Sequence, residues 1–480
     1  MNRTHKFSRQ PEQVTRRQFL DRSNKFVLGS ATAASAILNL NLLSQLAGAD
    51  LPEAEDDYRA LVCVHFAGGN DSFNMVAPCE GSGYEEYLES RGGIALPSSG
   101  EVDGLLPLDG VLVNGDGRKL GIHPSLPFLQ AQYNSGKAAI VANVGTLVEP
   151  TTLANLQSGN FRVPLGLFSH SDQSMQWQTS LSDQRSAATG WGGRMADLLA
   201  GFNEPSNVSM NVSGAGDNIF QTGINTIAYA FSANGSVELS AWNSPSNAAR
   251  RQAVEGILNA EYQNAFERAF AVRKKGAIQS NADYREAILV APTVNSPFTR
   301  SNSLSAQLKI VAKTIAARKV LCKQRQTFFV QLDGFDLHGN LGTQHAILLG
   351  RVNQALSEFQ VALVEMGVMD KVTTFTSSDF GRTLSSNGSG TDHAWGGNHL
   401  VFGGAVNGGQ VYGTYPELAL ESSLDTGRGR LIPTTSVDEY VSDLALWMGV
   451  SKTNLPLVLP NLSRFHDPDL GPAMGYMATT

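Results

Sequence analysis

The sequence predicts an α/β protein whose core is a parallel sheet, and three observations support this prediction. Residues 328–332 (FFVQL) and 371–376 (KVTTFT) are apolar, β-branched runs of the kind found in buried parallel strands. Between them, apolar or ring residues recur at alternating spacings of four and three, which predicts an amphipathic helix over 344–366. Residues 59–66 (RALVCVHF) form a third apolar run. Strand, helix and strand make a βαβ unit, so we expect 328–332 and 371–376 to be neighbouring strands with a ligand edge at their carboxyl ends.

Further elements are expected on either side of this unit. Residues 137–144 (KAAIVANV) predict a second central strand, and 303–320 predict a helix that leads into the strand at 328–332. Residues 201–247 are rich in Asn, Ser and Gly, and 250–275 show one long, charged helical pattern. We therefore expect a peripheral insertion or cap around 201–300.

The composition allows a large core and excludes one class of partner. Of the 480 residues, 42% are hydrophobic and 16% are charged, which suits one large α/β domain or two to three smaller ones. The net charge of −7 gives no general affinity for nucleic acid. The three cysteines are scattered and predict no disulfide framework.

The first 49 residues have the pattern of an export signal. Arg16 and Arg17 are followed by Gln-Phe-Leu and then by an apolar, small-residue run over 26–46, after which comes Ala-Gly-Ala at 47–49. Adjacent arginines in this setting are typical of the twin-arginine type. The alternative is a membrane anchor, but the polar content of the run favours cleavage after Ala49. We expect a protein that uses the twin-arginine export machinery, is periplasmic or extracellular, and has no membrane span after the signal is removed.

Five short segments carry the residues that could form a site. They lie at 67–76 (AGGNDSFNMV), 168–179 (FSHSDQSMQWQT), 333–340 (DGFDLHGN), 374–383 (TFTSSDFGRT) and 390–399 (GTDHAWGGNH). Their acidic and histidine side chains are Asp71, His170, Asp172, Asp336, His338, Asp379, Asp392, His393 and His399. Because several of these segments follow predicted strands, we expect the side chains to meet at one edge of the sheet.

Three kinds of chemistry could account for these residues. Carboxylates and imidazoles bind divalent ions, and two ions about 3.5–4 Å apart can hold the attacking and leaving oxygens of an in-line displacement. A Ser-His-Asp hydrolase would need a G-x-S-x-G turn after a strand, and the sequence has none. In the structural alternative, each aspartate caps a turn or helix and each histidine is a satisfied interior polar group. The clustering after predicted strands favours the metal site.

Several motifs occur in a characteristic order behind the export signal: GGNDSFN, an apolar strand before Val-Gly-Thr, GFDLHGN, SSDFGRT and GTDHAWGGNH. This order resembles the bacterial domain-of-unknown-function 1501 family, which is similar to the alkaline phosphatase and sulfatase superfamily. The resemblance implies an alkaline-phosphatase-like α/β sandwich around a mostly parallel sheet with helices on both faces, as a single domain over 50–480. It also implies one or two divalent metal ions (Zn, Mn, Mg or Ca) at the strand ends.

The resemblance also implies metal ligands at particular positions. Asp71 is similar to the superfamily's first metal-binding aspartate. Asp336 and His338 resemble its Asp/His pair, with the spacing D-x-H in place of D-x-x-x-H. Asp379 stands in the place of the Asp-His-Gly motif, with Phe380 where a ligand histidine would be.

The remaining implied site residues come from the other segments. His393, with Asp392 beside it, resembles the late histidine ligand, and His399 is a further candidate. His170 and Asp172 make the segment at 168–179 a second candidate site loop. The implied nucleophile is a hydroxyl at a helix start, for which Ser72, Ser169 and Ser171 all remain open. Arg382 is a candidate anion-binding guanidinium.

Two functions follow from these expectations. The first is an exported metal-dependent hydrolase of phosphate or sulfate esters, acting on a small-molecule or glycan substrate. The second is a non-catalytic exported protein of the same fold that binds a glycan, an anion or a protein partner. Phe380 in a ligand position supports the second.

Overall fold

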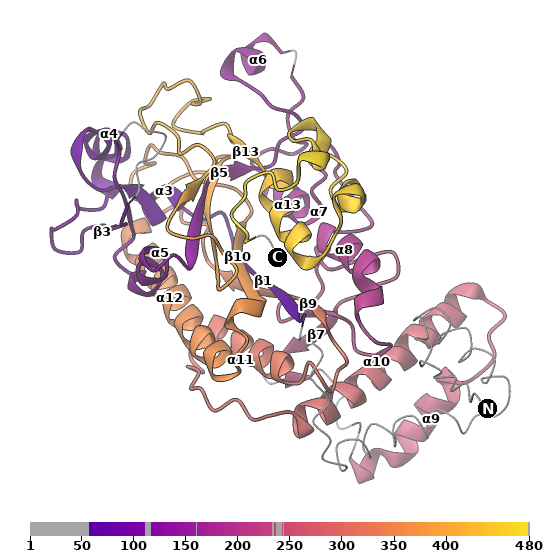
Figure 1. Cartoon of the computed structure of the whole chain (residues 1–480). Coiled ribbons are helices and arrows are strands. Elements are labelled where there is room, and N and C mark those ends of the chain that lie inside the picture. The colour runs from indigo at the N-terminus through magenta and orange to yellow at the C-terminus, as the bar shows by residue number, and fades with distance from the viewer. Residues whose placement is uncertain are drawn as a thin grey trace, which may run out of the picture. The chain divides into compact units, whose positions relative to one another are not determined.

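A ten-stranded sheet forms the centre of the fold (Figure 1). The computed structural model describes residues 57–110, 117–159, 161–232, 235–236, 242 and 244–478. Within them the strands follow the order β12 (Val411–Tyr412), β5 (Ala138–Gly145), β11 (Gly397–Gly403), β10 (Val372–Ser378), β1 (Arg59–Ala67), β9 (Arg325–Asp333), β6 (Asn211–Ser213), β7 (Tyr229–Ser232), β8 (Gly235–Ser236), with β13 (Thr435–Ser436) paired to β5. Only β11 and β8 run antiparallel to their neighbours. The predicted α/β class with a mostly parallel sheet is confirmed.

The two strands of the predicted βαβ unit are present, but they are not neighbours. Both β9 and β10 pair in parallel with β1, which lies between them, so that Cys63 is level with Phe329 on one side and Phe375 on the other. Helix α12 (Leu341–Glu365) therefore crosses over one strand. The prediction of adjacent strands was wrong because the first strand of the chain inserts between them. Three carboxyl ends thus meet at the predicted ligand edge.

Helices cover both faces of the sheet, as predicted. Side chains that alternate along β1 belong to different cores: Val62 and Val64 pack in one, and Leu61 and Cys63 in the other. The first core includes α5 (Pro127–Asn134), α11 (Ser303–Ala316) and α12, and the second includes α7 (His170–Thr179), α8 (Trp191–Leu199) and α13 (Val437–Met448) (Figure 1). The strands read as continuous apolar runs because both faces are buried.

The segment around 201–300 first adds strands to the central sheet and then forms two helices. Strands β6 to β8 extend the sheet beyond β9, and α9 (Ala248–Leu258) and α10 (Ala265–Val290) follow. One helix was expected over 250–275, but the chain breaks it after Leu258. The Asn264 side chain then caps α10 by accepting hydrogen bonds from the backbone N–H groups of Phe266 and Glu267.

Short elements complete the described chain. A second sheet contains β2 (Val76–Pro78), β3 (Leu106–Pro107) and β4 (Leu120–Ile122), and the other α-helices are α3 (Ser72–Met75), α4 (Gly81–Arg91), α6 (Leu153–Ser158) and α14 (Leu455–Val458). The 3-10 helices are Gly92–Ile94, Ala200–Phe202, Pro245–Asn247, Met369–Lys371, Lys452–Asn454, Leu462–Arg464 and Pro468–Leu470. Among the residues that the structure describes, no helix combines the length and the apolar character needed to cross a bilayer. The predicted export signal at 1–49 lies outside the described residues.

Candidate metal centre

The loops after β1, β9 and β10 meet in close contact at the carboxyl edge of the sheet. The backbone N–H of Gly68 donates to Asp379 Oδ2 over 3.1 Å, which joins the first loop to the third. Gly68 has a φ of +115°, and a Cβ there would lie 2.4 Å from the backbone nitrogen of Asp336 in the second loop. Only glycine fits such a conformation and such a close approach. The Gly-Gly turn that follows β1 therefore allows Asp336 and Asp379 to lie side by side.

Three side chains from distant segments converge at this edge. His170 from the start of α7, Asp336 after β9 and His393 before β11 each place a ligand atom within 4.8 Å of the others. His170 Nε2 lies 3.5 Å from Asp336 Oδ2, and His393 Nε2 lies 3.3 Å from Asp336 Oδ1. His338 adjoins the group, with its Nε2 atom 3.0 Å from Asp336 Oδ1 and 3.1 Å from His393 Nε2. The Asp336 side chain is 43% exposed, so the group is open to solvent.

The opposite nitrogen of each imidazole contacts a hydrogen-bond acceptor. His170 Nδ1 lies 2.7 Å from Asp379 Oδ2, His338 Nδ1 lies 3.1 Å from Asp392 Oδ1, and His393 Nδ1 lies 2.9 Å from the carbonyl oxygen of Phe168. Carbonyl and carboxylate oxygens only accept, so each Nδ1 faces a group to which it can donate a hydrogen bond. The three Nε2 atoms all face Asp336. Metal-binding histidines are held in this way in proteins generally.

His65 completes the support of this group and was missed by the sequence analysis. Its Nε2 atom lies 3.1 Å from Asp379 Oδ1, and its Nδ1 atom lies 3.0 Å from the Ser377 hydroxyl. Burial alone would raise the pKa of the Asp379 carboxyl, but the contacts with His65 and His170 lower it below its usual value. The available signal was a histidine near the end of an otherwise apolar strand, on the strand that proved to be central.

Substitution of Asp379 by Asn tests this support. The amide keeps the shape of the side chain but loses the negative charge that lies against His170 Nδ1. We expect metal affinity to fall by about 10–100-fold, as for other outer partners of metal ligands. Isothermal titration calorimetry with zinc measures the change, with Asp172→Asn on the same helix as the matched control. A D379N affinity equal to that of the control would contradict the role of Asp379.

Arg382 anchors Asp336, in place of the anion-binding role expected for it. Its buried guanidinium donates to the carbonyl oxygens of Gly68, Gly69, Thr391 and Phe335 and pairs with the Asp336 carboxylate. Burial would raise the pKa of the Asp336 carboxyl, but the hydrogen bond and charge of Arg382 bring it below its usual value. Its donors are engaged within the protein, so Arg382 is a positioning residue.

Phe380 forms an apolar wall behind two of the imidazoles. The residue is buried, and the centre of its ring lies 4.8 Å from the ring of His170 and 4.6 Å from that of His393. Burial lowers the pKa of His393 below its usual value, which keeps the ring neutral and able to donate a lone pair at neutral pH. Phe380 thus packs against His170 and His393 from the position where the resemblance implies a ligand histidine.

Asp392 supports His338 from the outer side. It accepts hydrogen bonds from Asn387 over 2.9 Å and pairs with Arg428 over 2.7 Å. The hydrogen bond from Asn387, together with Arg428 and His338, lowers the pKa of Asp392 to about 2. Asp392 is therefore ionised throughout the physiological range and holds the His338 ring.

Three predicted ligands, Asp71, Asp172 and His399, lie outside the converging group, and two of them, Asp71 and His399, are buried in the core. Asp71 is buried as the N-cap of α3, where its Oδ2 atom pairs with Arg91 over 2.6 Å and accepts from Thr391. His399 is buried in β11 with its ring 4.6 Å from that of Trp177, and burial lowers its pKa to about 3. Both expectations of metal binding are corrected: Asp71 is an ion-paired helix cap and His399 is a core histidine.

Asp172 and the candidate serines also have defined places. Asp172 lies in the first turn of α7 against Gly166, outside the converging group. Ser72 is buried, and its hydroxyl accepts from the backbone N–H of Asn398 over 2.8 Å, so its oxygen is engaged in the core. Ser169 is the N-cap of α7, next to His170, and its Oγ atom lies 3.3 Å from that of Ser171. Of the three serines, Ser169 directly precedes a residue of the converging group.

An apolar cavity of about 580 Å³ adjoins the centre. Its lining includes Leu156, Leu167, Phe168, Trp395 and Arg430. Two of these residues also touch His393: the carbonyl of Phe168 accepts from its Nδ1–H, and Arg430 Nε donates to its backbone oxygen over 3.0 Å. The cavity therefore lies directly beside a residue of the converging group.

Comparison with known proteins identifies a family and several distant structures. The family model described as "Protein of unknown function (DUF1501)" matches residues 58–426. No curated protein matches the sequence.

Solved structures match over most of the chain at low identity. The lipoteichoic acid synthase LtaP from Listeria monocytogenes is 9% identical with a TM-score of 0.30, and the match covers 85% of this chain and 78% of that one. Ps i-CgsB in complex with k-i-k-neocarrahexaose is 12% identical with a TM-score of 0.34, over 86% and 77% of the two chains. Alkaline phosphatase from the Antarctic bacterium TAB5 is 10% identical with a TM-score of 0.28, over 75% and 96%. Similarity at this level assigns no activity.

Proposed function

The chain belongs to DUF1501, a family described as proteins of unknown function. From the side chains of the candidate metal centre we propose that it is an exported metal-dependent hydrolase of phosphate or sulfate esters. The observation that carries the proposal is the orientation of the three imidazoles. His170, His338 and His393 each have Nδ1 fixed by an acceptor and Nε2 aimed at Asp336. Three imidazole nitrogens directed at one exposed carboxylate are a donor set of the kind that holds a divalent ion.

The donor set fits one divalent ion. Three imidazole nitrogens and a carboxylate oxygen suit zinc better than magnesium or calcium, which prefer oxygen ligands. Phe380 removes the ligand that the resemblance implies for a second ion. When bound, the ion would polarise the ester oxygen and offset the negative charge that develops during displacement.

The adjoining cavity supports an ester whose alcohol part is apolar. Leu156, Leu167 and Trp395 would bury that part, and the Arg430 guanidinium, which lies 5.4 Å from the centre of the Phe168 ring, adds a positive charge at the wall. Aryl or alkyl esters would then react at Asp336 with the alcohol portion in the cavity. Polar esters of glycerol size would leave the cavity empty.

Metal content and turnover test the proposal together. The purified protein is analysed for bound metal and assayed with an aryl phosphate, a phosphodiester and an aryl sulfate, with and without chelator. We expect about one zinc ion per chain, hydrolysis of at least one ester, and loss of turnover with chelator. Metal-free protein without turnover would refute the enzyme and favour the binding-protein alternative.

Among the candidate serines, Ser169 is placed best to act as the nucleophile. It precedes His170 directly and lies at the positive end of α7. We expect Ser169→Ala to lower kcat by about 10³-fold or more, as removal of a nucleophile does in other hydrolases. Ser171→Ala is the matched control and should change kcat by less than about threefold. An unchanged rate in S169A would show that water attacks directly.

A further inference from the structure

A second cavity lies at the opposite end of β9 from the metal centre. Its volume is about 400 Å³, and it is lined by the segment 203–210, the turn 225–227, Ala196, Ala200 and Lys323. Lys323 lies two residues before β9 begins, whereas Asp336 lies three residues after it ends. The cavity is therefore separate from the proposed reaction site.

The lining of this cavity includes a buried lysine, Lys323. Its side chain lines the cavity, and the residue is only 6% exposed. Among the described residues, no hydrogen bond or ion pair reaches its ammonium group. Burial lowers the pKa of Lys323 below its usual value, which is the effect of an ammonium removed from water without a counter-charge. A buried cation without a partner is costly, and a bound anion would relieve that cost.

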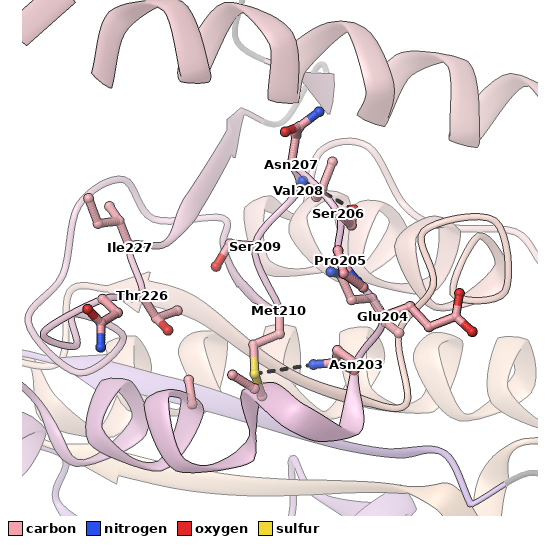
Figure 2. A pocket seen from close by; sticks show the side chains of 14 residues that line it. Asn203, Glu204, Pro205, Ser206, Asn207, Val208, Ser209, Met210, Thr226 and Ile227 are labelled. Carbon is pink, nitrogen blue, oxygen red and sulfur yellow. Dashed lines mark hydrogen bonds between the residues drawn. The ribbon is translucent and has the colours of Figure 1, made fainter. Parts of the chain in front are cut away.

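The carboxylates around the cavity do not neutralise Lys323. Asp197 accepts hydrogen bonds from the backbone N–H groups of the turn 224–226, the closest at 2.6 Å. Asp283 accepts from the Asn207 amide over 2.7 Å. Figure 2 shows the Glu204 carboxylate directed away from the hollow between Ser209 and Thr226. A bound anion would supply the counter-charge that these carboxylates do not.

The rest of the lining indicates the size and polarity of that ligand. Figure 2 shows Ser209 pointing toward the turn that carries Thr226 and Ile227. Hydroxyl groups of this kind can donate to an oxyanion, while Met210, Val208 and the two alanines offer apolar surface. A cavity of 400 Å³ exceeds the needs of an inorganic ion and lies within the range of small-molecule sites.

We propose that this cavity binds a small organic oxyanion, a carboxylate or a phosphate monoester, whose charged head pairs with Lys323 and whose short apolar body lies against Met210. The site does not depend on the proposed hydrolase activity. It would give the protein a second ligand at the amino ends of the strands.

Calorimetry with matched probes tests the site. The purified protein is titrated with hexanoate, hexyl phosphate and neutral hexanol in the presence of chelator, which removes any contribution of a metal ion. We expect at least one anion to bind about tenfold or more tightly than hexanol, because a charge-assisted hydrogen bond is lost in the alcohol. The stronger of the two anions identifies the head group.

Variants distinguish this site from the metal centre. Lys323→Met should weaken anion binding by about tenfold or more, whereas Lys452→Met, on the exposed surface, should leave it unchanged. Ala200→Trp fills the cavity and should abolish binding without altering Lys323, which preserves the test if K323M does not fold. Asp336→Asn should bind the anion normally. Equal binding of hexanol, full binding by A200W, or binding of neither anion would overturn the proposal.

Discussion

Replacement of Asp336 by Asn is expected to lower zinc affinity by more than about 100-fold and to abolish ester hydrolysis. Loss of an outer partner costs about 10–100-fold in affinity, and Asp336 is the carboxylate on which all three imidazoles converge. The amide keeps the volume of the side chain but cannot supply the negative charge that balances a divalent ion. Arg382 keeps its four carbonyl acceptors, so the variant should still fold.

The matched control is Asp333→Asn, three residues earlier. Asp333 is an exposed carboxylate at the end of the same strand and accepts from Gln331 over 2.6 Å, outside the converging group. Metal content by mass spectrometry, zinc titration and turnover are compared for both variants. If D336N retains one zinc ion per chain with the affinity of D333N, the proposed centre is wrong.

The fold could be predicted because its local patterns are strong. Both faces of the sheet are covered, so β1, β9 and β10 are continuous apolar runs that are visible in the sequence. Their order in the sheet could not be predicted. A βαβ pattern gives parallel strands and one crossover, but it does not say whether another strand lies between them, and here β1 does. That insertion also explains why His65 was overlooked.

The candidate site was predicted in part, for a physical reason. Residue types and positions after strands led to Asp336, His338, His393 and His170, which the structure brings close together. The contacts of these side chains could not be predicted in the same way. The sequence does not show whether a carboxylate pairs with a positively charged side chain or lines a cavity. Asp71 follows a strand as Asp336 does, yet its carboxylate pairs with Arg91, which lies twenty residues later in α4.

The pair of Asp71 and Arg91 provides the prediction with the largest effect on stability. Arg91 is buried, and besides Asp71 it donates to Asn74 and to the carbonyl oxygens of Thr383 and Leu384. Arg91→Met leaves the Asp71 carboxylate buried without its cation. Breaking a buried pair in this way costs about 3–5 kcal/mol. Urea unfolding at pH 7.5 measures the loss.

A surface pair provides the contrast. Lys119 and Glu80 lie 3.4 Å apart with half-exposed side chains, and Lys119→Met should change the unfolding free energy by less than about 1 kcal/mol. The double variant Asp71→Asn/Arg91→Met should recover part of the loss, because no unpaired charge remains. A loss below about 1 kcal/mol in R91M would show that the pair contributes little.

The pH dependence of the R91M variant separates charge from packing. Burial opposes ionisation of Asp71, but Arg91 outweighs it and the pKa of the folded wild-type carboxyl lies below 3.8. A depressed pKa contributes stability that is complete above the unfolded value and is lost as the pH falls through the folded value. Without Arg91 the buried carboxyl instead takes a raised pKa and protonates readily. The destabilisation of R91M should therefore be largest near pH 7.5 and shrink toward pH 4.5. A loss that stays constant over this range would mean that Arg91 stabilises the loops through its carbonyl contacts and not through Asp71.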